Sequence, residues 1–121
     1  MGEERFSGSL LYQVVKGDLR FGTSHTERTV VLTGGVDQIL RLNPRRLSFI
    51  ICNRSLSVVD VAFSPTMLPG GGLMLMPNGG TFAVSWLEDG ELAGSDLYGV
   101  GPEGATLHVI EVMATVAGGE A

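Results

Sequence analysis

The sequence predicts an all-β protein: an antiparallel β-sandwich of about eight strands, jelly-roll-like, with an extended N-terminal arm. Three observations support this fold class. Eighteen glycines divide the 121 residues into short segments. Between the glycines lie runs rich in β-branched and aromatic residues, and several of these runs alternate apolar and polar side chains with a period of two. A chain of this length forms one domain.

Eight segments have the character of strands. In chain order they are 29–32, 38–42, 47–53, 58–63, 73–76, 81–86, 97–100 and 106–116. Strong turn formers separate them, among them Gly34-Gly35, Asn43-Pro44 and Pro77-Asn78-Gly79-Gly80. The alternation predicts a core that consists of Ile39, Leu47, Phe49, Ile51, Val59, Val61, Phe63, Phe82, Val84, Trp86, Val109 and Met113.

The sandwich is expected to span residues 27–117. Residues 1–26 lack a clear partner signal and include a polar loop at Gly22–Thr26, so we predict an arm that becomes ordered on a neighbouring subunit. Residues 118–121 are expected to form a flexible tail. The acidic start has no hydrophobic stretch typical of a signal peptide, and Leu68–Pro77 is too short and too rich in Gly and Pro for a membrane span.

Charge is divided unevenly along the chain. Residues 1–54 hold all eight basic side chains and five acids, for a net charge of +3, whereas residues 55–121 hold eight acids and no Lys or Arg. The total of −5 argues against a nucleic-acid binder. The two halves could pair between subunits, or they could neutralise each other inside one fold.

No set of residues predicts catalysis, so we expect a protein that is not an enzyme and that holds no cofactor or metal. His25 and His108 are the only histidines, and the single cysteine, Cys52, excludes an internal disulfide and is expected to be an inert, buried side chain. Gly99–Gly104 matches the dinucleotide-binding pattern G-x-G-x-x-G, but the segment that follows it reads as a strand instead of a helix. The acids at 88, 89 and 91 are expected to form a solvated turn.

The segment Leu42–Asn53 (LNPRRLSFIICN) resembles the Asn-Pro-x-Arg, hydrophobic strand and Asn motif of many short virion proteins of tailed bacteriophages. In those proteins the motif is followed by a strand like Val58–Phe63 and a Gly- and Pro-rich element like Gly72–Gly80. A closing pair of strands then matches Leu97–Gly101 and Thr106–Glu111. The order of the motifs over residues 36–112 carries the resemblance.

The resemblance implies a small sandwich or jelly-roll subunit that decorates and stabilises the phage head shell, as a capsid decoration (cement) protein. The expected partner is the major capsid protein or another virion protein. We expect a dimer or trimer located in the virion and assembled in the host cytoplasm, with no membrane and no nucleic acid as partner. The interface is predicted from the arm and from a basic edge: Arg5, Phe6, Tyr12, Arg20, Phe21, Arg45 and Arg46. A carbohydrate-binding or other accessory module of the tail, neck or receptor-binding apparatus is the alternative.

Overall fold

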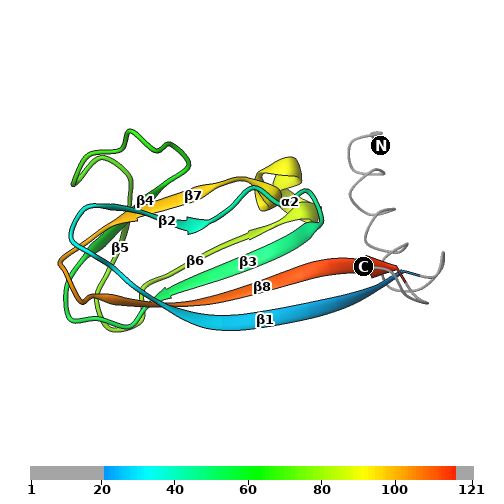
Figure 1. Cartoon of the computed structure of the whole chain (residues 1–121), viewed down its shortest axis with the longest axis horizontal. Coiled ribbons are helices and arrows are strands. Elements are labelled where there is room, and N and C mark those ends of the chain that lie inside the picture. The colour runs from blue at the N-terminus through cyan, green and yellow to red at the C-terminus, as the bar shows by residue number, and fades with distance from the viewer. Residues whose placement is uncertain (1–20, 117–121) are drawn as a thin grey trace.

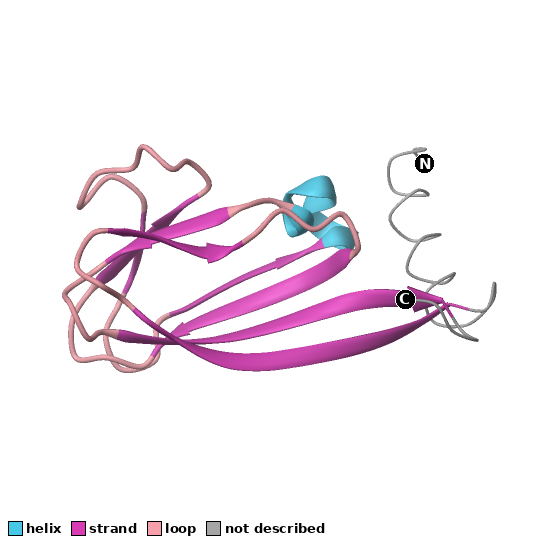
Figure 2. Ribbon diagram, viewed as in Figure 1, coloured by secondary structure: helices cyan, strands magenta, loops and turns pink. Residues whose placement is uncertain are grey.

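Two four-stranded antiparallel sheets face each other in the computed structural model, which describes residues 21–116 (Figure 1). Within residues 21–116 strands dominate, and the helix of this part of the chain is one short stretch before β7 (Figure 2). The elements are β1 Phe21–Val31, β2 Val36–Leu40, β3 Arg46–Asn53, β4 Val59–Ala62, β5 Leu73–Leu75, β6 Thr81–Ser85, helix α2 Trp86–Asp89, 3₁₀ helix η2 Gly90–Gly94, β7 Leu97–Val100 and β8 Thr106–Val116.

The strand order is that of a jelly roll. Sheet A has the order β1-β8-β3-β6, and sheet B has the order β2-β7-β4-β5. Four antiparallel pairs, β1 with β8, β2 with β7, β3 with β6 and β4 with β5, have the pairing of one long hairpin that folds over on itself. Further ladders between β3 and β8 and between β4 and β7 join these pairs into the two sheets. The predicted fold class is therefore confirmed.

The core lies between the sheets and is made by inward-facing residues of both. Seven of the predicted core residues are buried: Ile39, Phe49, Ile51, Val59, Val61, Val84 and Val109. Phe63, Phe82 and Trp86 are partly buried against this core, and Leu47 and Met113 have intermediate exposure. The sequence interpretation missed Leu32, Leu40, Leu75, Ala93, Leu97, Ala105 and Leu107, which are also buried.

The prediction of an arm with a polar loop is wrong for residues 21–26, because these residues form the first half of β1. Each of them pairs with a residue of β8, from Phe21 opposite Val116 to Thr26 opposite Glu111. Thr23–Thr29 are exposed, so the backbone ladder holds this half of the strand without help from burial. The remainder of the predicted arm, residues 1–20, and the predicted tail lie outside the described residues.

The acidic segment after β6 is helical, where we had expected an open turn. Ser85 ends β6 and caps α2, because its Oγ accepts a hydrogen bond of 3.3 Å from the backbone N–H of Glu88. Trp86 consequently begins the helix and does not continue the strand. The acids at 88, 89 and 91 are solvent-exposed, as predicted. Neither α2 nor η2, the helical elements of residues 21–116, has the length to cross a membrane.

Candidate interaction surface

The predicted interface residues separate into three groups. Arg5, Phe6, Tyr12 and Arg20 lie outside the described residues. Phe21 is the first residue of β1, and Arg45 is exposed in the loop between β2 and β3. Arg46 does not lie at an exposed basic edge, because its side chain is only 2% exposed.

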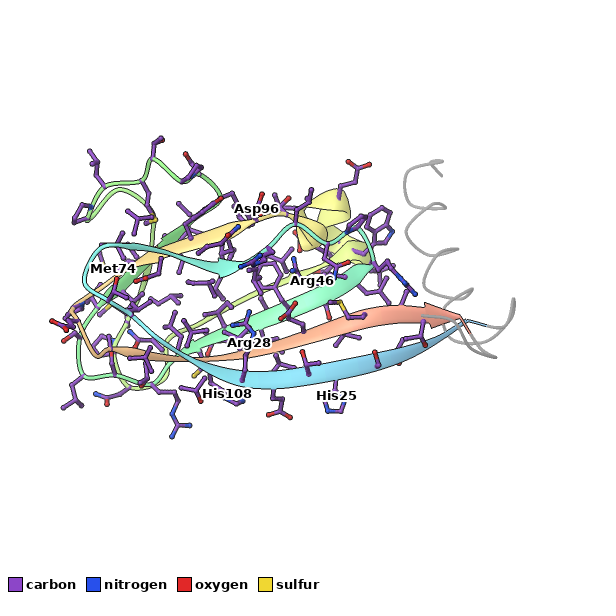
Figure 3. The ribbon with its side chains drawn as sticks, in the orientation of Figure 1. His25, Arg28, Arg46, Met74, Asp96 and His108 are labelled. Atoms are coloured by element: carbon purple, nitrogen blue, oxygen red, sulfur yellow. The ribbon has the colours of Figure 1, made fainter. Side chains whose placement is uncertain are left out.

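Arg46 can be buried because each nitrogen of its guanidinium group has a hydrogen-bond partner inside the sandwich. Its Nε donates a hydrogen bond of 3.0 Å to Oε1 of Glu111 on β8, and its other nitrogens donate to the backbone carbonyls of Arg41, Ala93 and Ser95. Arg28 on β1 approaches the other oxygen of Glu111 at 3.4 Å and donates to the carbonyl of Ile39 on β2 at 2.6 Å. Figure 3 shows both arginines pointing into the space between the sheets. These contacts join the basic half of the sequence to the acidic half within one fold.

The histidines and the cysteine do not form a reactive centre. His25 and His108 lie on the outer face of sheet A (Figure 3), where His108 Nε2 is 2.9 Å from Oε1 of Glu27. Cys52 is not buried as expected: it is partly exposed, and it lines a hollow of about 300 Å³ with Arg54, Asn78 and Gly79. Within residues 21–116, no three side chains of His, Cys, Asp or Glu are grouped closely enough to hold a metal ion.

The glycine motif at 99–104 is a connection between two strands. It includes the end of β7 and leads directly into β8, and Gly104 has a positive φ of 90°. No helix follows it, so its backbone offers no helix N-terminus to a phosphate.

The two open sides of the sandwich differ in charge. On one side the edge strands are β1 and β2, which carry His25, Glu27, Arg28 and Asp37. On the other side the edge strands are β5 and β6, and the chain has no charged residue from 61 to 87. Asp60, just before this stretch, is buried on β4 and accepts a hydrogen bond of 2.8 Å from the N–H of Gly70.

We call the second side the uncharged side and define it by β5, β6, Phe63 and Phe82. Leu73 and Met74 on β5 are 50% and 60% exposed. Phe63 and Phe82 stack edge to face with their ring centroids 6.1 Å apart, and Phe82 stacks in the same way on the buried Phe49 at 5.9 Å. This row of rings leads from the core to the open side of the sandwich, where the last two rings are only partly covered.

Natural proteins protect exposed strand edges with charged side chains, proline or a covering segment, because an unpaired edge attracts other strands. The β1–β2 side follows this rule, whereas β5 and β6 contain neither charge nor proline. Sequence reasoning missed the uncharged side. Its signal is the charge-free stretch at 61–87, but its importance depends on the topology that puts both edges on the same side of the sandwich.

A second hollow of about 480 Å³ lies on the outer surface near the start of α2. It is lined by Thr23, Leu47, Ser48, Ser85, Trp86, Leu87 and Val112. The hollow therefore combines the indole ring with three hydroxyl side chains.

Comparison with known proteins found no matching family model and no match among curated proteins. One solved structure is similar and is described by the statement "Bacillus endospore appendages form a novel family of disulfide-linked pili". The similarity covers 80% of this chain and 88% of that chain, with 9% sequence identity and a TM-score of 0.48. This likeness is too distant to carry a functional inference.

Proposed function

We propose that this chain is a structural subunit that binds to a larger protein assembly, namely a capsid decoration subunit on the head shell of a tailed bacteriophage. The observation that carries the binding role is the uncharged side, where two edge strands without charge or proline lie together with partly covered apolar side chains. The motif order over residues 36–112 supports the choice of a phage virion as the assembly. The partner is then the major capsid protein or another virion protein.

The uncharged side provides both kinds of contact that a docking surface needs. The edges offer backbone N–H and C=O groups for strand pairing, which gives affinity without requiring side-chain specificity. Leu73 and Met74 offer apolar area, and covering a side chain of this kind completely is worth about 1.5–3 kcal/mol. A modest contact is sufficient for a decoration subunit, because repeated contacts on a symmetric shell add avidity.

Co-sedimentation with shells assembled from the major capsid protein of the same genome tests the proposal. The full chain should bind with an occupancy that is a fixed multiple of the shell subunits. The double variant Leu73→Asp, Met74→Asp should lose at least tenfold in affinity, because it puts charges on the docking surface. Leu42→Asp is the matched control: Leu42 is 68% exposed but lies in the loop between β2 and β3, so its variant should bind normally. Absence of binding by the full chain at saturating concentration would remove the proposal.

A carbohydrate-binding module is the second candidate, and the hollow beside Trp86 favours it. Sugar sites pair an aromatic ring with polar groups, and Thr23, Ser48 and Ser85 supply hydroxyls there. Trp86 is the only tryptophan of the chain, so its fluorescence reports on this hollow alone. Titration with a panel of mono- and oligosaccharides should change the emission if the module binds sugars, and a constant spectrum up to millimolar concentrations would exclude this candidate.

A further inference from the structure

We propose that the free edge of β6 accepts residues 6–15 of a second copy of this chain as an added strand, so that copies join through their N-terminal segments. The inference rests on the proposed function only in treating the uncharged side as a docking surface. It names a different partner for that surface and can be tested without any shell.

The hydrogen bonds around β6 show which backbone groups face the open edge. The N–H of Asn53 on β3 donates to the carbonyl of Gly80 at 2.8 Å, so the backbone N–H and C=O groups of the even-numbered residues here face β3. The N–H of Ser85 donates instead to Asp89 Oδ2 at 3.0 Å, away from β3. Since backbone groups alternate along a strand, Thr81 and Ala83 direct their N–H and C=O groups to the free edge. An added strand would find two donors and two acceptors there.

The inner face of the added strand would meet the aromatic row. Phe82 faces the core from β6, and Phe63 stacks on it from the end of β4, with both rings partly exposed. β6 is five residues long, so five residues of an extended segment would lie beside it, and every second one of these would place its side chain on the inner face next to the rings. This position requires an occupant with one continuous apolar face.

Residues 6–15, FSGSLLYQVV, have that pattern. In an extended conformation one face would carry Phe, Gly, Leu, Tyr and Val at the even positions 6–14. The opposite face would carry two serines and a glutamine with Leu and Val, which matches the small, uncharged outer face formed by Ser48, Ala83 and Ser85. The segment has no charge and no proline, and the stretch 61–87 has no charge, so pairing along Thr81–Val84 would desolvate no ion. The carboxylate of Asp89 lies at the end of this edge, where it accepts the N–H of Ser85.

The segment that links residues 6–15 to β1 is too short for these residues to reach β6 of their own copy, so the added strand must come from a second copy. His25, Val112, Ser48 and Ser85 lie in one row across sheet A, and Phe21 is four residues beyond that row along β1. A strand added beside β6 would lie four strand spacings, or about 19 Å, from β1. If this strand ran antiparallel to β6 with Val15 beside Thr81, the distance from Val15 to Phe21 would be about 32 Å, because Thr81 and Phe21 also lie at opposite ends of the sheet. The six steps from Val15 to Phe21 cover at most about 20–22 Å.

The test uses two variants of the full chain and measures mass by light scattering with size-exclusion chromatography. Ala83→Pro removes one edge-facing N–H and leaves the ladder with β3 intact, since proline is tolerated where the N–H faces outward. Leu10→Asp with Tyr12→Asp places charges on the apolar face of the donor segment. The native chain should form dimers or larger species, and each variant alone should be monomeric.

Mixing the two variants is the decisive step, because one keeps an intact donor segment and the other keeps an intact β6 edge. The expected product is a 1:1 heterodimer that cannot grow further. A mixture that stays monomeric, or a native chain that is itself monomeric, would overturn the inference. Oligomers that survive in the Leu10→Asp, Tyr12→Asp variant would also overturn it, since the edge would then pair with something other than the donor segment.

Controls separate folding defects and shell binding from the docking of the donor strand. Far-UV circular dichroism must show an intact sandwich for each variant, and Ala83→Lys replaces the proline variant if that chain does not fold. Thr29→Lys puts the same charge on the exposed edge strand β1 and should leave the oligomer unchanged. Shell binding without oligomers would support the proposed function and overturn this inference. Oligomers without shell binding would support this inference and overturn the proposed function.

Discussion

The Nε of Arg46 on β3 and Oε1 of Glu111 on β8 form a buried ion pair 3.0 Å long, with side chains 2% and 11% exposed. Because Arg46 also donates to carbonyls of the β2–β3 loop and of the segment around η2, the pair fixes how sheet A meets the chain that leads into sheet B. Its role is structural, and a change here should appear in stability.

Glu111→Ala should therefore destabilise the sandwich by about 3–5 kcal/mol, because it leaves the Arg46 guanidinium buried without its counter-charge. The double variant Arg46→Met, Glu111→Leu should recover most of the loss, since it removes both charges together. Arg45→Ala is the control, as this neighbour is exposed and should change stability by less than about 0.5 kcal/mol. Urea unfolding followed by tryptophan fluorescence measures all three.

Phe49→Ala should cost about 3–5 kcal/mol, because Phe49 is completely buried at the centre of the core. Trp86→Ala should cost clearly less. Trp86 lies at the start of α2, is only partly buried and borders a hollow, so its removal creates little enclosed space. Thermal unfolding by circular dichroism compares the two, and an equal loss of stability would contradict this placement of Trp86.

Asn53→Ala should cost about 1–3 kcal/mol, because it leaves buried backbone groups without partners. The Asn53 amide nitrogen donates to the carbonyls of Ser57 and Leu75 at 2.8 and 2.9 Å, and its side-chain oxygen accepts from the N–H of Ser55 at 2.9 Å. Hydrogen exchange should accelerate first at Ser55 and in the neighbouring loops. Unchanged exchange there would show that the side chain does not hold these loops.

Two glycines should respond oppositely to replacement by alanine. A Cβ on Gly94 would lie 2.6 Å from the carbonyl oxygen of Asn43, a backbone atom that cannot move away easily, so Gly94→Ala should be destabilising. A Cβ on Gly35 meets nothing within 4 Å, and its φ is not positive, so Gly35→Ala should be neutral or stabilising by up to about 1 kcal/mol. Denaturation midpoints of the two variants, measured side by side, check the difference in sign.

The alternation of side chains was sufficient to predict the fold class and most strands, because a two-layer sandwich imposes a period of two on every strand. It could not find the first half of β1, whose exposed polar residues are held by pairing to β8. It also misplaced Arg46. The available signal was Glu111, a lone carboxylate on the same face as the buried Leu107 and Val109, which calls for a buried cation that sequence proximity cannot identify.

The pairing of β1 with β8 also determines the timing of folding during synthesis. Among the strands of residues 21–116, β1 leaves the ribosome first and its partner β8 leaves last, so sheet A cannot close until residue 116 is free of the exit tunnel. Until then β1 waits without its ladder and the charge-free stretch at 61–87 is exposed in a partly folded chain. Pairings between distant parts of a chain are slow to form. Holdase chaperones that bind uncharged apolar segments should therefore associate with this protein while it is being translated and release it once β8 is in place.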